Sequence, residues 1–193
     1  IFVDDLVMFT GNDSFYHMRL IDSLLGNSFN RIEFDPYTNY PYGTNVFWPV
    51  LFDWVLAGII WLFSTGAPTA STIGTIAVFF PAVLGALVVV PVYFIGKNLF
   101  DNKSVGLIAA ALVAVMPTEL LNRSRLGYVD HHVAETLLIA CVILFLILAI
   151  KACSEHQLGF IHFRTRQWPV LKKPLLYSFL TGFFMALYLL TWV

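Results

Sequence analysis

The chain has 193 residues, of which 59% are hydrophobic and 12% are charged, and its net charge is −1. A soluble globular domain carries about 25% charged residues, so this composition, with a mean hydropathy of +0.78, excludes that class. The near-zero net charge gives no indication of a nucleic-acid partner, and we expect an all-α, polytopic transmembrane helical protein. Because the sequence begins without Met and ends inside an apolar run, we expect it to be a fragment of a longer chain.

The N-terminal stretch is polar, acidic and rich in turn-forming residues. One short helix is expected at 14–25, where apolar residues recur at helical spacing. Asn12 or Asp13 is expected to cap this helix, because both side chains accept hydrogen bonds from exposed backbone N–H groups. His17 is expected on the solvated face of the helix, with a phosphate contact as the alternative. The prolines and glycine within 36–43 exclude regular structure after it.

Residues 48–65 form an apolar segment that is barely long enough to span a membrane and is interrupted by Asp53 and Gly58. The segment also contains three tryptophans, which are typical of a helix that lies in the membrane interface. We therefore expect a membrane-surface helix at 48–65, inside a first external loop that covers residues 1–70.

Four longer apolar segments make up a membrane domain at 71–193. They predict transmembrane helices at about 71–96, 104–121, 133–151 and 174–193. The basic residues between these segments lie in loops 97–103 and 152–173, and basic loops stay on the cytoplasmic side. Two crossings separate the two loops, so both can be cytoplasmic, which places loop 122–132 and residues 1–70 outside. We expect a multi-pass protein of the cell membrane.

The loop before the third long segment reads "NRSRLGYVDHHVAE" and carries Asp130, His131 and His132. Alternate residues of an extended chain project to the same side, so Asp130 and His132 can share a divalent cation. A mixture of oxygen and nitrogen ligands favours Mn²⁺ or Mg²⁺ over thiolate-binding metals. Asp130 can equally be the N-cap of the helix that begins near Val133.

Asp13 has the same two interpretations, as a helix cap or as a cation ligand. The expected topology places it on the side of Asp130, and ionisable groups beside the apolar layer are costly and mark functional sites. Arg123 is open to three roles: snorkelling to the interface, pairing with a phosphate, or orienting Asp130. Trp192 ends the last segment, where interfacial anchoring is the ordinary role of tryptophan.

Three sequence blocks carry a resemblance to a known family. "GNDSFYHMRLIDSL", "FDPYTNYPYGTNVFWPVLFDW" and "NRSRLGYVDHHVAE" resemble the catalytic subunit of oligosaccharyltransferase, in particular the archaeal AglB type, which is related to bacterial PglB and the eukaryotic catalytic subunit. The order of the blocks and the gaps between them fit as well. The resemblance covers essentially the whole chain and implies part of a GT-C type glycosyltransferase membrane domain.

The resemblance also implies an activity with its partners and cofactor. Members of this family transfer a glycan from a lipid-linked donor, a dolichyl phosphate or pyrophosphate, to Asn in Asn-x-Ser/Thr sequons of an acceptor polypeptide. They do so on the extracytoplasmic side of the membrane, with Mn²⁺ or Mg²⁺. The resemblance implies that Asp13 and Asp130 are catalytic residues that bind the metal together with His132.

Binding of the lipid phosphate is implied for a second group of residues. The resemblance places His131 and Trp192 near that phosphate, and we expect Arg123 there as well. Phe47 stands where many archaeal relatives carry His, which is expected to weaken one phosphate contact. The family's later external-loop Glu, its WWDYG block and its C-terminal domain are absent from these residues, so we expect this fragment to be inactive alone.

Two other functions stay open on the sequence. One is a different lipid-linked-sugar GT-C glycosyltransferase that acts on lipid or on Ser/Thr, and it would lack the Asp-His-His block and need no sequon. The other is a divalent-cation transporter, which would carry ionisable residues near the middle of the bilayer. Here the ionisable cluster lies at the ends of the apolar segments instead.

Overall fold

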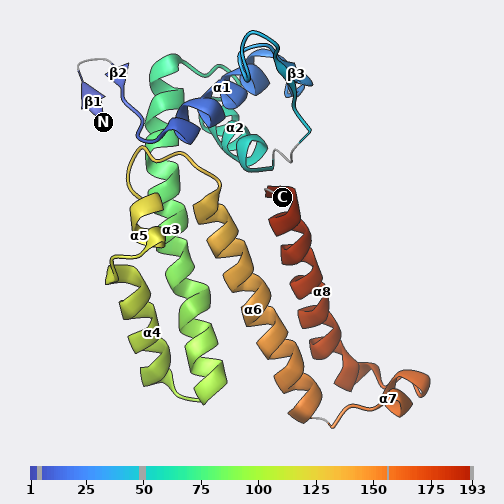
Figure 1. Cartoon of the computed structure of the whole chain (residues 1–193). Coiled ribbons are helices and arrows are strands. Elements are labelled where there is room, and N and C mark those ends of the chain that lie inside the picture. Colours follow the sequence, from blue (N-terminus) through green and yellow to red (C-terminus); the bar gives the residue numbers. More distant parts are fainter. Residues whose placement is uncertain (4–5, 48–50, 156, 192–193) are drawn as a thin grey trace.

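The computed structural model describes residues 1–3, 6–47, 51–155 and 157–191. Long helices run side by side, and the shorter elements gather mainly at one end of them (Figure 1). The helices are α1 (Asn12–Gly26), α2 (Leu51–Phe63), α3 (Ala70–Phe100), α4 (Lys103–Val115), α5 (Glu119–Arg123), α6 (His132–Glu155), α7 (Phe160–Arg164) and α8 (Trp168–Thr191). Two antiparallel hairpins pair β1 (Phe2–Val3) with β2 (Leu6–Val7), and β3 (Phe34–Asp35) with β4 (Thr44–Asn45).

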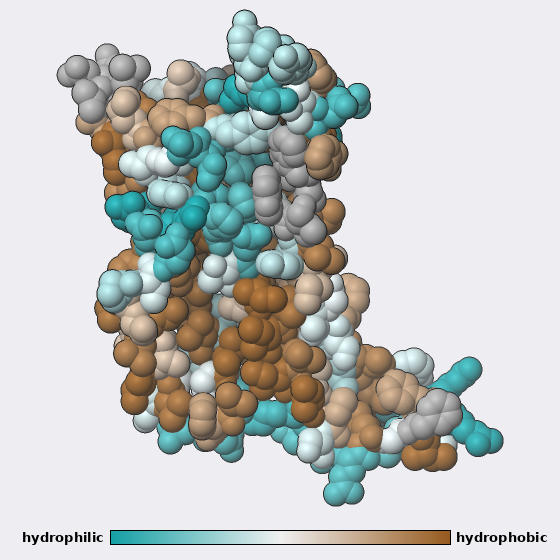
Figure 2. All heavy atoms as spheres, viewed as in Figure 1, coloured by the Kyte–Doolittle hydropathy of each residue, from teal (hydrophilic) through white to brown (hydrophobic). Residues whose placement is uncertain are grey.

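Helices α3, α6 and α8 are each long and apolar enough to cross a membrane. Helix α6 lies between the other two and packs against both. Figure 2 shows hydrophobic residues gathered over these helices, with hydrophilic residues at the end that carries α1 and again at the opposite end. The prediction of an all-α, polytopic membrane fold is confirmed. Trp192, at the end of the last predicted segment, lies outside the described residues.

The apolar segment predicted as one helix at 104–121 is divided in the structure. Helix α4 ends at Val115, Met116 is extended with φ −66° and ψ 130°, and α5 starts at Glu119. Pro117 causes the break, because a proline disfavours helical backbone at the residue before it. The 13 residues of α4 extend about 20 Å, which is shorter than the ~30 Å hydrocarbon layer.

Helix α2 lies at the same end of the molecule as α1 (Figure 1). Its 13 residues are fewer than a membrane span needs. The first three residues of the helix predicted at 48–65 lie outside the described residues. A buried apolar cluster joins α1, α2, α3 and the loop before α6 through Ile21, Leu56, Ala77 and Val129. This cluster fixes α1 and α2 over the start of α6.

The basic residues between the long segments gather at the end opposite α1 (Figure 1). Lys97 is in the last turn of α3 and Lys103 begins α4. The ammonium of Lys151, on α6, donates a hydrogen bond of 2.9 Å to the carbonyl oxygen of Asn98, which ties α6 to the α3–α4 turn. The cytoplasmic location of this end stays a prediction from the charge pattern.

Helices α3 and α4 pack closely through glycines. A Cβ added at Gly96 would lie 3.1 Å from the Cα of Gly106, and a Cβ at Gly106 would lie 2.7 Å from the carbonyl oxygen of Tyr93. Small residues let membrane helices approach closely, because the backbones themselves make the contact. Gly182 on α8 differs, since a Cβ there meets no atom of the described residues within 4 Å.

We predict that Gly106→Ala lowers the stability of the protein, whereas Gly182→Ala does not. Both changes replace glycine within a helix, so both gain about 1 kcal/mol of helix propensity. Only Gly106→Ala forces the two helices apart, at a cost of about 1–3 kcal/mol. Thermal unfolding in detergent measures the difference. Equal unfolding temperatures for the two variants would contradict the close α3–α4 contact.

Candidate functional site

The loop that leads into α6 is held by backbone hydrogen bonds to two other segments. The N–H of Gly127 donates to the carbonyl oxygen of Val78 on α3 at 2.9 Å, and the N–H of Thr10 donates to the carbonyl oxygen of Gly127 at 2.9 Å. Gly127 has φ 77°, a left-handed conformation that glycine adopts readily. These bonds bring the start of α1 beside the loop that carries Asp130.

Asp130 is fully buried, at 0% exposure, and cationic or imidazole groups surround its carboxylate. Oδ2 accepts a hydrogen bond of 2.6 Å from Nη1 of Arg123. Oδ1 lies 2.9 Å from Nδ1 of His131 and 3.8 Å from Nε2 of His17. Among the described residues, no donor makes a hydrogen bond of normal geometry to Oδ1. Oδ1 therefore has unused acceptor capacity beside His131 and His17.

The charge state of Asp130 follows from these neighbours. Burial disfavours ionisation, but the nearby imidazoles of His131 and His132 and the hydrogen bond from Arg123 together lower the pKa of Asp130 below its usual value. The hydrogen bond to Glu119 and the Asp130 carboxylate raise the pKa of Arg123. Asp130 is therefore an anion at neutral pH, as a cation ligand must be.

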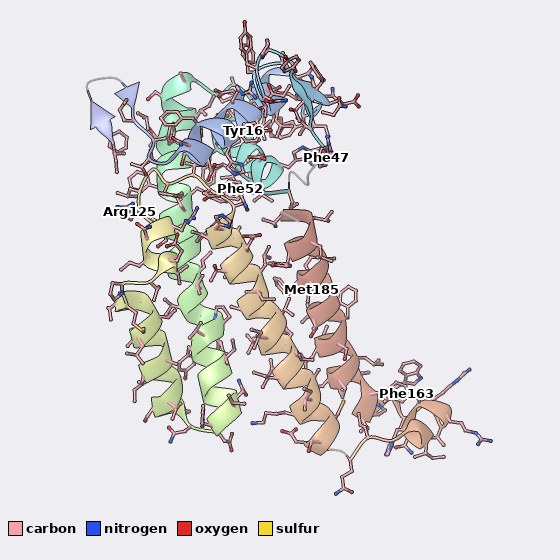
Figure 3. All side chains as sticks on the ribbon, viewed as in Figure 1. Tyr16, Phe47, Phe52, Arg125, Phe163 and Met185 are labelled. Atoms are coloured by element: carbon pink, nitrogen blue, oxygen red, sulfur yellow. The ribbon has the colours of Figure 1, made fainter. Side chains whose placement is uncertain are left out.

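A second buried carboxylate, that of Asp53, is connected to Asp130 through His17 and His131. His17 lies on α1, and its Nδ1 is 2.7 Å from Oδ1 of Asp53 on α2. Its Nε2 is 3.1 Å from Nδ1 of His131. Phe52, at the end of the bundle where α6 begins (Figure 3), packs its ring 5.0 Å from the ring of His17. Asp53, His17, His131 and Asp130 thus form a buried row from α2 through α1 to the loop.

His132 lies on the other side of Asp130, at the edge of a cavity. Its Nε2 is 3.9 Å from Oδ2 of Asp130, and its Nδ1 is 2.7 Å from Oε2 of Glu135. The cavity has a volume of about 380 Å³ and lies between α5, α6 and α8. Its polar lining includes Arg123, His132 and Glu135. A ligand in this cavity would meet both a guanidinium and an imidazole.

Within the part of the chain that the structure describes, two groups of residues have the geometry to hold a metal ion. His17, Asp130 and His131 form one, and His131, His132 and Glu135 form the other, with one ligand atom from each residue within 4.8 Å of the others. Imidazole nitrogens and carboxylate oxygens suit zinc as well as harder divalent cations. The acceptor capacity of Asp130 Oδ1 fits the same chemistry.

The predicted site residues have different places in the structure. Asp13 is exposed in the first turn of α1, one helical turn before His17. The capping role predicted for Asn12 or Asp13 is wrong, because Gly11 holds the N-cap position and no side chain caps the helix. Asp130 faces Arg123 and His131 instead of capping α6.

Other site residues were missed or misplaced by the sequence analysis. His17 is buried, at 4% exposure, where the sequence analysis expected a solvated residue. Asp53 was noted only as an interruption of an apolar segment, which is the signal that could have identified it. An acidic residue in a buried apolar helix needs a partner, and here that partner is His17.

Comparison with known proteins gives the family. Residues 2–193 match the sequence family described as "Oligosaccharyl transferase STT3, N-terminal", and the chain belongs to that family. A dolichyl-phosphooligosaccharide-protein glycotransferase 3 of Archaeoglobus fulgidus is 35% identical over 94% of this chain and 20% of its own length. A dolichyl-monophosphooligosaccharide–protein glycotransferase AglB of Haloferax volcanii is 29% identical over 96% of this chain and 18% of its own. The chain thus spans about a fifth of the length of the curated relatives it matches.

Solved structures of oligosaccharyltransferase from Archaeoglobus fulgidus share the fold. The structure tethered to an acceptor peptide with the NVT sequon has a TM-score of 0.78 at 30% identity, over 94% of this chain and 20% of that one. The complex with an inhibitory peptide and a dolichol-phosphate has a TM-score of 0.77 at 29% identity, with the same coverage. The complex with Zn and sulfate has a TM-score of 0.75 at 29% identity, over 95% and 21%.

We predict that Arg123→Leu destabilises the protein by about 1–3 kcal/mol, because it removes the hydrogen-bond donor to the buried Oδ2 of Asp130. Glu119→Gln removes the other ion pair of Arg123, but the Glu119 side chain is 69% exposed, so we expect little effect. Thermal unfolding in detergent compares the two variants. If Glu119→Gln destabilised the protein as strongly as Arg123→Leu, the ion pair of Arg123 with Asp130 would not be the one that stabilises the protein.

Proposed function

We propose that this chain, as a member of the oligosaccharyl transferase STT3 family, forms the donor- and metal-binding part of a membrane oligosaccharyltransferase. That enzyme would transfer a glycan from a dolichyl phosphate or pyrophosphate carrier to Asn in Asn-x-Ser/Thr sequons. One observation carries the proposal: buried, ionised Asp130 is surrounded by Arg123, His131 and His17 at the end of three apolar helices. The related structures bound to dolichol-phosphate and to a sequon peptide support these partners.

Asp13, Asp130 and His132 are the residues that we propose to hold Mn²⁺ or Mg²⁺. Oδ1 of Asp130 has acceptor capacity, and Nε2 of His132 lies 3.9 Å from Oδ2. The hydrogen bond from Thr10 to Gly127 brings the first turn of α1, with Asp13, toward the same loop. Two carboxylates and one imidazole would give mainly oxygen ligands, which hard divalent cations prefer. The zinc in a related structure supports a divalent-cation site in this family.

The cavity beside Asp130 is the proposed place of the donor phosphate. Nε of Arg123 donates at 2.6 Å to Glu119, whose side chain is 69% exposed. A phosphate could replace that exposed carboxylate while Nη1 of Arg123 keeps its hydrogen bond to Asp130. We propose His131, the neighbour of the cavity-lining His132, as a second contact. The lipid tail of the donor can remain in the bilayer, because the cavity lies between α5, α6 and α8.

The acceptor amide is a poor nucleophile, because resonance uses the lone pair of its nitrogen. The carboxylates of Asp13 and Asp130 can accept hydrogen bonds from the amide N–H groups and so weaken that conjugation. When bound, a divalent cation stabilises negative charge on the leaving phosphate as a Lewis acid. Asp130 stays ionised for this role because its pKa is lowered. The transfer would invert configuration at the sugar carbon.

The site would face the outside of the cell membrane. It lies at the end of the long helices opposite Lys97, Lys103 and Lys151, and basic loops stay cytoplasmic. A cation transporter would need ionisable residues near the middle of the bilayer, whereas Asp130 precedes α6 and Asp53 is on α2. The chain spans about a fifth of its relatives, so we propose that residues 1–193 alone are inactive.

We predict that Asp13→Ala and Asp130→Ala each reduce glycosylation of a sequon peptide by the full-length protein about a hundredfold or more, because each loses cation-dependent stabilisation of the leaving group. Asp22→Ala is the matched control, because it removes an exposed carboxylate from α1 outside the proposed metal site. The measurement is the rate of glycopeptide formation from the lipid-linked donor.

Undiminished transfer in both Asp13→Ala and Asp130→Ala would refute the proposal. A second comparison uses an acceptor peptide in which the sequon Asn is replaced by Gln. An oligosaccharyltransferase loses its product with this peptide. Transfer that continued would instead favour another lipid-linked-sugar glycosyltransferase.

A further inference from the structure

We infer that Asp53 and His17 form a positioning pair, which holds the His131 ring and thereby the Asp130 carboxylate in the geometry that binds a divalent cation. The metal in this inference rests on the proposed function. The orientation of the His131 ring by the pair does not require a metal. Neither Asp53 nor His17 has to touch the cation. Both act through the two residues of the loop before α6.

The hydrogen-bond pattern fixes the His17 ring. A carboxylate only accepts hydrogen bonds, so we assign the hydrogen of the 2.7 Å contact with Asp53 to Nδ1 of His17. Nε2 of His17 then lies 3.1 Å from Nδ1 of His131, a distance at which one of the two nitrogens donates to the other. The orientation of the His131 ring therefore depends on that of His17, and the orientation of His17 depends on Asp53.

Burial makes this dependence strong. Asp53 is 2% exposed, His17 4% and His131 5%, so water does not compete for their hydrogen bonds. The rings are also packed: the centroid of His17 lies 5.0 Å from that of Phe52 and 5.3 Å from that of His131. An amide in place of the Asp53 carboxylate can either accept from or donate to Nδ1 of His17, so the ring would no longer be restricted to one tautomer.

A related arrangement occurs in metal sites where a carboxylate orients a metal-binding histidine. Such outer carboxylates fix the tautomer and direction of the ring, and their loss weakens metal binding about 10–100-fold. Here His131 lies between the pair and Asp130, because its Nδ1 is 3.1 Å from His17 and 2.9 Å from Oδ1 of Asp130. A rotated His131 would leave Oδ1 without its nearest nitrogen and allow the carboxylate to turn.

Metal affinity tests the inference in the full-length protein purified in detergent. Binding of Mn²⁺ alone is followed by the electron paramagnetic resonance signal of the free ion. We expect Asp53→Asn to raise the Kd for Mn²⁺ about tenfold or more, and Asp53→Glu, which keeps the carboxylate, to restore most of the affinity. Asp22→Asn is the matched control, because it removes one negative charge from an exposed position on α1.

A spectroscopic readout separates positioning from a purely structural role. Ring-nitrogen resonances of ¹⁵N-histidine-labelled protein report which nitrogen of His17 and His131 carries a hydrogen, and they need no metal. We expect Asp53→Asn to shift the His131 resonances while the unfolding temperature stays within a few degrees of the wild type. If Asp53→Asn does not fold, His17→Gln carries the same comparison, with its effect read on His131 and Mn²⁺.

The outcomes are distinct. Loss of Mn²⁺ affinity with shifted His131 resonances supports the positioning pair. Unchanged His131 resonances, or a loss of affinity no larger than that of Asp22→Asn, overturns it. A wild-type protein that binds no Mn²⁺ overturns the proposed metal function. In that case the His131 resonances of Asp53→Asn alone show whether Asp53 positions the His131 ring.

Discussion

The burial of the Asp130 charge is the constraint on which this end of the molecule depends. Removing a carboxylate from water costs several kcal/mol unless positive or hydrogen-bonding groups replace the solvent. Three residues supply these groups: Arg123 on α5, His131 next to Asp130 in the loop, and His17 on α1. Each of these elements must therefore reach the start of α6, and the packing of α1 and α2 over that point follows from the requirement.

The backbone enforces the same convergence independently of charge. Gly127 bonds to α3 through Val78 and to the N-terminal segment through Thr10, so one residue joins three parts of the chain that are far apart in sequence. Its left-handed conformation, with φ 77°, allows the loop to turn between them. Side-chain chemistry and backbone bonding thus agree on the position of Asp130, which is how a sequence specifies one arrangement over its alternatives.

The sequence predicted those elements that depend on residues close together in the chain. The apolar runs identified the regions of α3, α6 and α8, and the Asp-x-His spacing marked Asp130. The break at Pro117 was overlooked because the apolar run continued across it, although the residue before a proline disfavours helix. The row from Asp53 to His131 was not predictable in this way. His17 is 36 residues from Asp53 and 114 from His131, so their contacts depend on how α1 and α2 pack.

Asp53 connects the membrane topology of the chain to its site. An ionised residue near the middle of a bilayer costs at least about 2.5–3.5 kcal/mol, which makes the apolar segment at 51–63 unsuitable as a span. At the end of the bundle the same carboxylate meets Nδ1 of His17, and its burial becomes possible. Leucine in place of Asp53 would make α2 more apolar and closer to a membrane helix, but it would leave His17 without its acceptor. The residue that interrupts the apolar sequence of α2 is thus the residue that contacts His17, the histidine next to His131.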